Sequence, residues 1–248
     1  MTMGATGTTL LFGIGLGPGD PDYMTVKARR LLQEAELLVH FCKSGERGNA
    51  RRIADQVVGR DEAREMALVY PVTTEFPPHH PEYACRIAKF YEECGERLAA
   101  ELSAGRRVSV LCEGDPFFYG SFMHLWRRLA HLFPTEVVPA VTGMSAAWTH
   151  AGAPITWGDD VLTVLPGTLA LEDLTARLKA TDAAVIMKLG RHLPKVRQAL
   201  EAAGLMERAI YVERAAMAEE KIVRLAERDD AKAPYFSIVI VPGNGRRL

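Results

Sequence analysis

The sequence predicts an α/β protein made of two domains, residues 1–153 and 154–248. Short apolar runs of strand length alternate with amphipathic helices along the chain, which is typical of a parallel sheet with crossover helices. A Pro- and Gly-rich segment with two adjacent acids, residues 151–160, interrupts this alternation and marks the predicted boundary. The 248 residues suffice for one or two hydrophobic cores without disulfide or metal support.

The first domain opens with an apolar strand at residues 8–15 and a helix that begins after Thr25, a suitable N-cap. Segment 65–81 is rich in proline and has no clear period, so we expect a long exposed loop there. The other elements are strands at 37–41 and 107–112, helices at 50–58, at 82–104 before Gly105 and near 122–129, and a strand and a helix of small residues within 135–152.

The second domain continues the alternation of strands and helices. The helix expected at 193–203 has Pro194 near its start and Gly204 just past its end, the asymmetry that helix termini favour. The other predicted elements are strands at 161–167, 183–190, 209–215 and 235–241, a helix at 170–180, and a short charged helix near 219–228.

Charge and cysteine usage exclude several classes of protein. The chain carries 30 Lys and Arg against 31 Asp and Glu, which disfavours a nucleic-acid partner but allows a local basic patch. Without a signal-peptide pattern or a long apolar stretch, the sequence predicts a cytoplasmic protein with no membrane partner. No C-x-x-C pair occurs, so we expect free thiols rather than disulfides or a zinc site at Cys42, Cys85, Cys94 and Cys112.

The glycine-rich segment 13–19 follows the first strand and invites comparison with nucleotide-binding loops. A G-x-G-x-x-G frame fails, because Pro18 or Asp20 occupies the position of the third glycine. The second strand ends without the acid that would bind a ribose, and the chain has no Gly-Lys-Ser/Thr sequence. NAD and ATP are therefore disfavoured. The glycines instead predict a tight turn at a strand end, where backbone can approach a ligand closely.

Two further turns follow strands of the first domain, at 113–116 and 142–145. Since parallel strands end at one edge of a sheet, the three turns are predicted to line a single crevice. Asp115 in the second turn can cap a helix, hold a ligand amine or orient the backbone, and these roles stay open. No G-x-S-x-G or H-E-x-x-H motif occurs, and His79 and His80 resemble a solvated loop pair, so neither covalent catalysis nor a metal requirement is expected.

The motifs of the three turns, GIGLGPGDPDYMTVKA, CEGDPFFYGS and VPAVTGMSAAW, resemble in order and spacing the tetrapyrrole methylase family of cobalamin and sirohaem biosynthesis. The segments VIMKLG and VERA are similar to its C-terminal domain. HFCKSGERGNARRIA, CEGDPFFYGSFMHL and MKLGRH look most like the branch that methylates C20 of precorrin-2 to give precorrin-3A. The resemblance implies two α/β domains, a kinked homodimer, and S-adenosylmethionine (SAM) bound in the cleft between the domains.

This resemblance implies SAM contacts from both domains. The choice between two neighbouring residues, Lys188 and Leu189, depends on a one-residue register and stays open. The chain also has Pro139-Ala140 where the family often has Pro-Gly. SAM carries no phosphate, so its site needs close backbone approach and apolar walls rather than a P-loop lysine. The implied contacts are Pro18, Gly114, Asp115, Phe118, Thr142, Gly143, Met187, Lys188 or Leu189, Ala215 and Ser237.

The implied reaction also explains why no nucleophile is found. The meso carbon C20 of a reduced tetrapyrrole has enamine-like electron density and can attack the methyl group directly, so the protein contributes chiefly positioning in a poorly hydrated site. Asp115 and His40 are the candidate bases for the proton lost afterwards. A cationic cluster after the second strand is either a trough for the substrate's carboxylate arms or a solvated helix start: Lys43, Arg47, Arg51 and Arg52.

Three other interpretations stay open at this point. The acceptor could be cobalt-bound precorrin-2, as in the anaerobic route, or another carbon could be methylated, as in the uroporphyrinogen-III enzyme. A non-catalytic tetrapyrrole carrier with the same fold is disfavoured, because a carrier has no need of the glycine turns that shape a SAM site.

Overall fold

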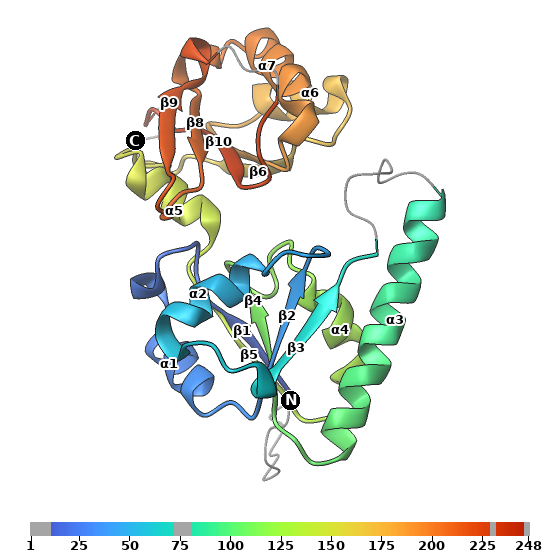
Figure 1. Cartoon of the computed structure of the whole chain (residues 1–248). Coiled ribbons are helices and arrows are strands. Elements are labelled where there is room, and N and C mark those ends of the chain that lie inside the picture. The colour runs from blue at the N-terminus through green and yellow to red at the C-terminus, as the bar shows by residue number, and fades with distance from the viewer. Residues whose placement is uncertain (1–10, 72–80, 229–231, 246–248) are drawn as a thin grey trace. The chain divides into compact units, whose positions relative to one another are not determined.

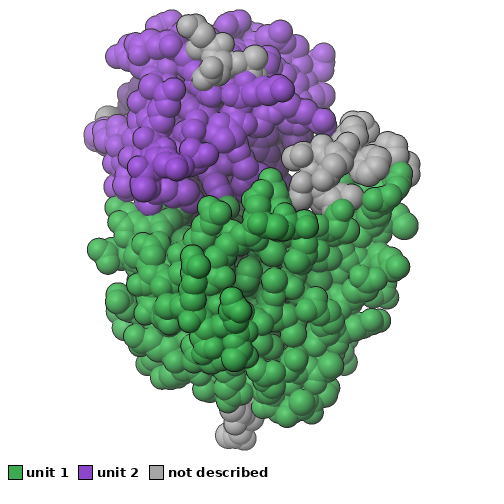
Figure 2. Space-filling view, viewed as in Figure 1, with its two compact units in different colours: residues 1–142 green, residues 143–248 purple. Residues whose placement is uncertain are grey.

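The computed structural model describes residues 11–71, 81–228 and 232–245. The chain divides into two compact units, Met1–Thr142 and Gly143–Leu248, and the described residues of each form one five-stranded sheet (Figure 2). The predicted α/β class is confirmed. The boundary predicted at 153/154 lies inside the second unit by this division, because helix α5 (Gly143–His150) packs on strand β10 (Ser237–Val241) of that unit.

The sheet of the first unit is parallel throughout, with strand order β3-β2-β4-β1-β5 (Figure 1). Its strands are β1 (Leu11–Gly15), β2 (Leu37–Cys42), β3 (Glu65–Val69), β4 (Val108–Cys112) and β5 (Thr135–Val138). Its helices are α1 (Val26–Gln33), α2 (Asn49–Val58), α3 (Pro81–Ser103) and α4 (Phe122–Leu129). All five strands end at one edge, which is where α/β sheets bind ligands.

Helices cover both faces of this first sheet, because its central strands are apolar on both sides. On one face, Ile14 of β1 packs with Leu32 of α1 and with helix α2. On the other face, Leu11 of β1 packs with helices α3 and α4. Gly13 also faces α4, and a Cβ there would lie 2.3 Å from the Phe122 ring. Gly13 is therefore required by helix packing, not by a ligand.

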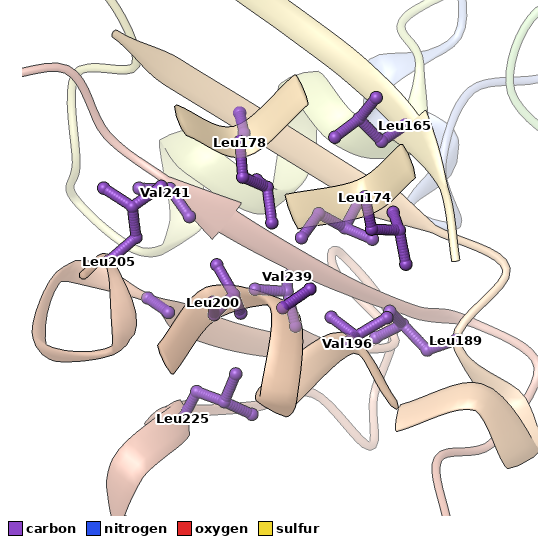
Figure 3. Close-up of a cluster of buried hydrophobic side chains, with 14 of the residues drawn as sticks. Leu165, Leu174, Leu178, Leu189, Val196, Leu200, Leu205, Leu225, Val239 and Val241 are labelled. Carbon is purple, nitrogen blue, oxygen red and sulfur yellow. The ribbon is translucent and has the colours of Figure 1, made fainter. Parts of the chain in front are cut away.

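The sheet of the second unit is mixed, with strand order β6-β7-β10-β8-β9. Strands β6 (Leu162–Pro166) and β7 (Ala183–Met187) are parallel, whereas β10 is antiparallel to β7 and to β8 (Ile210–Glu213), and β9 (Lys221–Arg224) is antiparallel to β8. Helices α6 (Leu171–Lys179) and α7 (Leu193–Ala202) cover one face, where their leucines gather around Val239 of β10 (Figure 3). Helix α5 covers the other face through Ala147.

Predicted helix termini are confirmed where local chemistry determines them. Thr25 Oγ1 accepts a hydrogen bond from the Ala28 N–H at 3.1 Å and so caps α1. Gly105 and Gly204 follow the ends of α3 and α7 with φ of +83° and +70°, the left-handed conformation that ends helices.

Two predicted elements are wrong, and both prove to be edge strands. Residues 65–69 form β3 rather than part of a loop, and residues 221–224 form β9 rather than part of a charged helix. An edge strand pairs on one side only, so few of its residues need to be apolar and the usual alternation of apolar and polar residues is weak. In β3 only Leu68 is buried. Residues 8–10 of the first predicted strand, and the pair His79 and His80, lie outside the described residues.

Candidate active site

The three turns that were predicted to act together follow β1, β4 and β5, which are neighbours in the first sheet. The Gly114 N–H donates to the Gly17 carbonyl at 2.8 Å, which joins the first two turns. The third turn is formed by residues 139–142 rather than the predicted 142–145, because Gly143 already begins α5. Asp115 Oδ2 accepts from the Ala140 N–H at 3.1 Å, which joins the second turn to this third one. The structure therefore brings the three turns into contact at the carboxyl edge of the parallel sheet.

The glycines of these turns are required for two different reasons. Gly17 and Gly114 have φ of +81° and +63°, in the left-handed region that favours glycine. Gly15 is required by crowding, because a Cβ there would lie 2.6 Å from the Ala140 methyl and 2.8 Å from the Gly114 carbonyl oxygen. Ala140, where the resemblance predicts glycine, is accommodated because Gly15 has no side chain.

Asp115 orients the second turn. Its Oδ1 accepts from the Phe117 N–H at 2.9 Å while Oδ2 holds Ala140, so of the roles left open by the sequence the structure supports orientation of the backbone. Each oxygen of the carboxylate keeps a second lone pair, so accepting a proton remains compatible with this geometry. Phe118 is half-buried beside it, and Tyr119 has a left-handed φ of +54°, a strained conformation that is found most often at functional sites.

The remaining predicted SAM contacts from the first half of the chain flank these turns. Pro18 follows Gly17 and is buried, whereas Thr142 is half-buried at the end of the third turn, and Gly143 is the first residue of α5. All four cysteines are free, as predicted. Cys112 ends β4, and burial raises the pKa of its thiol well above the usual value, so this edge offers no thiolate nucleophile there.

The structure divides the predicted cationic trough into buried and exposed members. Arg51 is 0% exposed and donates to Glu65 Oε1 at 2.7 Å. Arg47 donates to Asp55 Oδ1 at 2.7 Å and to the same Glu65 oxygen at 3.1 Å. Because the protein's own carboxylates already pair with both guanidinium groups, this geometry disfavours Arg51 and Arg47 as binders of a substrate arm.

The two other cations of the cluster, Lys43 and Arg52, are exposed and stay candidates for binding carboxylates. Glu65 shows how strongly the network is coupled: burial by itself raises the pKa of its carboxyl, but the hydrogen bonds from the two arginines lower it to about 2. His40, on β2, is 4% exposed with Nε2 3.9 Å from Glu65 Oε2. Burial lowers the pKa of His40, and its interior position disfavours the predicted role as a base.

The predicted SAM contacts of the second unit lie at one edge of its own sheet. Strands β7 and β8 both run antiparallel to β10, so their carboxyl ends lie beside the start of β10. Ser237, the first residue of β10, pairs with Glu213, the last residue of β8. Three residues just after these strands have left-handed φ without being glycine: Lys188 (+56°), Arg214 (+50°) and Ala216 (+60°).

The structure settles which side chains after β7 point the same way. Leu189 is fully buried in the cluster under α6 and α7, whereas Met187 and Ala215 pack with Ile238 on the opposite face. Lys188 is exposed between them. Ser237 is buried, and its Oγ donates to the Pro234 carbonyl at 2.9 Å, so its side chain is turned away from that face. Met187 and Ala215 are therefore the predicted apolar contacts that share a surface.

Two carboxylates that hold these turns were missed from the sequence. Glu113 Oε1 accepts from the Ala50 N–H at 3.1 Å, which ties the end of β4 to the start of α2. In the second unit, Glu220 Oε2 accepts from the Ala216 N–H at 2.7 Å and lies 2.8 Å from His150 Nδ1. The partners of Glu113 lie far away in the sequence, so no local pattern reveals its role.

No helix within 11–71, 81–228 and 232–245 has the length and apolar character needed to cross a membrane. In the same ranges, His, Cys, Asp and Glu side chains nowhere gather in threes as a metal ion would require.

The fold and the three turns define an α/β protein with backbone turns gathered at the carboxyl edge of a parallel sheet, the edge where such folds bind their ligands. Comparison with known proteins narrows this class. The model of the tetrapyrrole (corrin/porphyrin) methylases matches residues 10–229, and the chain belongs to that family.

Relatives with curated names agree with this assignment. A precorrin-2 C(20)-methyltransferase from a Sinorhizobium species is 51% identical over 97% of this chain and 98% of its own length. A cobalt-precorrin-2 C(20)-methyltransferase from Salmonella typhimurium is 28% identical over 93% of this chain and 95% of its own. Among solved structures, a cobalt precorrin-4 methyltransferase has a TM-score of 0.69 at 26% identity, with 94% of each chain covered.

A second solved structure is a uroporphyrin-III C-methyltransferase from Thermus thermophilus in complex with S-adenosyl homocysteine. It has a TM-score of 0.63 at 22% identity and covers 93% of this chain and 96% of its own. At this identity the likeness shows a shared fold. The prediction that SAM lies between the two units of this chain stays a prediction.

Proposed function

We propose that this chain transfers a methyl group from SAM to C20 of precorrin-2, giving precorrin-3A in cobalamin biosynthesis. The observation that carries the proposal is the 51% identity to a precorrin-2 C(20)-methyltransferase over nearly the full length of both chains. The relative that uses a cobalt-bound substrate is 28% identical, and this difference favours the metal-free acceptor. Both are C20 methyltransferases, which supports C20 over another carbon.

The residues of the first unit's edge fit a SAM ligand. Gly17 and Gly114, in left-handed conformations without side chains, leave their backbone accessible to a ligand, and Gly15 lets the neighbouring turns pack closely. We place the ligand along Pro18, Gly114, Asp115 and Phe118, and along Thr142 and Gly143. From the second unit we retain Met187, Ala215 and the backbone of Lys188 and Ser237, and we drop the side chain of Leu189 because it is fully buried.

The chain's residues then act by holding two reactants in line. When bound, SAM supplies an electrophilic methyl group and departs as S-adenosylhomocysteine as the bond to C20 forms. No protein nucleophile takes part, so alignment by the backbone turns is the main catalytic contribution, for which effective molarities of about 10⁵–10⁸ M set the upper range. Asp115 is the base that we propose for the C20 proton, since its carboxylate lies at the strand edge whereas His40 is buried.

The substrate's carboxylate arms require cations at the same edge. Lys43 and Arg52 lie on the segment that follows β2 and are exposed, and we assign the arms to these two side chains. We further infer a cytoplasmic homodimer that needs no metal ion of its own, which rests on the family resemblance. The domain division at 153/154 is likewise retained as a proposal for where the second domain becomes independent.

The proposal is tested by two measurements on the whole chain. Calorimetric titration with SAM is expected to show binding at micromolar concentrations, and the SAM-loaded protein is expected to convert metal-free precorrin-2. Faster conversion of the cobalt-bound substrate would instead favour the anaerobic route. Absence of SAM binding at millimolar concentration would refute both methyltransferase assignments and leave the carrier.

A further inference from the structure

Helix α2 begins without a cap of its own. Its N-cap residue is Gly48, which has no side chain to bind the free N–H groups of the first turn. No other residue fits there, because a Cβ on Gly48 would lie 2.1 Å from the Phe41 carbonyl oxygen and 3.0 Å from His40 Nδ1. The close approach of β2 thus prevents α2 from capping itself with Ser, Thr, Asp or Asn, which most helices use.

Glu113 provides the missing cap from a distant part of the chain. Its Oε1 accepts from the Ala50 N–H at 3.1 Å, and the side chain of Asn49 is a second hydrogen-bond partner. A carboxylate at this end of α2 also interacts favourably with the helix dipole. Burial raises the pKa of Glu113, against the opposing effect of these hydrogen bonds. The half-buried side chain of Glu113 is therefore held by the start of one helix.

The position of Glu113 in the sequence joins two parts of the proposed site. The next residue, Gly114, donates to Gly17 in the first turn, and Asp115 holds Ala140 in the third turn. On its other side, Glu113 holds the start of α2, the helix that carries Arg52. The end of β4 is thus in contact with the three turns that we assign to SAM and with the segment that we assign to the tetrapyrrole.

We propose that Glu113 is a positioning residue that sets the substrate-arm segment, Lys43 to Arg52, against the SAM-binding turn at Gly114. It acts through the Ala50 N–H and does not touch the reacting atoms. The inference rests on the proposed function for the identity of the two ligands. Its structural part, that Glu113 anchors the start of α2, stands independently of that function.

The test compares three variants of the full chain. Glu113→Ala removes the cap and is expected to raise the KM for precorrin-2 about tenfold or more, since small misplacements have effects of this order or larger. Its affinity for SAM is expected to change less than about threefold, because the Gly114–Gly17 and Asp115–Ala140 hydrogen bonds that hold the turn do not involve the Glu113 side chain. Glu113→Gln keeps a carbonyl oxygen that can accept from the Ala50 N–H. Its KM for precorrin-2 is expected to lie close to the wild-type value.

Thr25→Ala is the matched control, because Thr25 caps α1 in the same unit and is no part of the proposed site. It is expected to lower the melting temperature about as much as Glu113→Ala while leaving the KM for precorrin-2 unchanged. If Glu113→Ala lowers only the melting temperature, as the control does, Glu113 is a cap without a role in substrate positioning and the inference is overturned.

Hydrogen exchange separates this inference from the proposed function. In Glu113→Ala, the amides of residues 49–52 are expected to exchange at least tenfold faster without any ligand, while those of α1 keep their rates. Unchanged exchange at 49–52 would overturn the anchoring itself. A wild-type chain that fails to methylate precorrin-2 refutes the proposed function instead, whatever the exchange result.

Discussion

The two sheet edges to which we assign SAM contacts are built in different ways. In the first unit, glycine turns touch one another so closely that a Cβ on Gly15 would lie within 3 Å of two neighbouring turns. Buried charges, with Arg51 at their centre, hold the adjoining helix. In the second unit, Lys188, Arg214 and Ala216 adopt the left-handed conformation with side chains in place.

This difference predicts which of the two edges tolerates side-chain substitutions. The turns of the second unit are held by hydrogen bonds: the Arg214 N–H donates to the Phe236 carbonyl at 2.8 Å, and the Gly167 N–H donates to the Met187 carbonyl at 2.7 Å. A hydrogen bond to backbone survives many side-chain changes, whereas a steric contact or a buried ion pair does not. We therefore expect large effects at the first edge and small ones at the second.

Removal of the buried guanidinium should have the largest effect. Arg51→Ala breaks the buried ion pairs of Arg51 with Glu65 and Asp55 and leaves Arg47 as the remaining partner of both carboxylates. We expect a loss of about 3–5 kcal/mol in the free energy of unfolding. Denaturant titration measures it. Arg52→Ala, one residue further on and exposed, is the control and should change stability by less than about 0.5 kcal/mol while raising the KM for precorrin-2. Equal losses from both variants would contradict the division into buried and exposed cations.

Low pH should reduce the free energy of unfolding of the first unit, because it protonates Glu65. Its pKa is lowered from 4.5 to about 2 in the folded chain, so its ionised form stabilises the fold above the unfolded pKa. This stability, about 3 kcal/mol at 1.36 kcal/mol per pKa unit, is lost as the pH falls from about 5 to about 2. The difference in unfolding free energy between wild type and Glu65→Gln should narrow across that range. A difference that is constant down to pH 3 would refute the coupling.

The close packing of the turns at the edge of the first sheet can be tested by a substitution that adds one methyl group. Gly15→Ala places a Cβ 2.6 Å from the Ala140 methyl and 2.9 Å from Pro116 Cδ, and we expect a loss of about 1–3 kcal/mol from overpacking. SAM affinity, measured by calorimetry, should fall at least about tenfold, the factor that 1.4 kcal/mol represents. Gly105→Ala, where a Cβ meets nothing within 4 Å, is the control and should keep SAM affinity.

The smallest effect is expected at the second edge. Lys188→Gly relieves a left-handed φ that costs about 1 kcal/mol, and this gain is partly offset by the greater freedom of glycine in the unfolded chain. The net change in unfolding free energy should stay below about 1 kcal/mol, with SAM affinity retained. A loss above about 2 kcal/mol would show that the Lys188 side chain supports this edge and that the two edges are more alike than proposed.

The sequence allowed the alternation of strands and helices, the helix caps and the three turns to be predicted, because each depends on local chemistry or on parallel topology. Arg51 could not be placed, because the pattern of residues 65–81 predicts a loop and so gives Glu65 no position in the sheet. Because β3 pairs with β2, Glu65 lies against Arg51 and Arg47. These two arginines are then paired inside the protein, and only Lys43 and Arg52 of the predicted trough stay exposed.

The register at 187–189 and the cap by Glu113 could not be predicted for a related reason. Which of Met187 and Leu189 faces the core depends on the helices that cover each face of the second sheet, and Glu113 meets Ala50 only because β4 and β2 are neighbours. Long-range contacts of this kind leave no pattern within a short window of sequence.

The most direct test of the account is to follow a ¹³C-labelled methyl group from SAM into the product and to assign the labelled carbon by NMR. The account predicts one labelled methyl group on C20 of metal-free precorrin-2. A label on any other carbon, or a label that appears only when the substrate carries cobalt, would contradict it.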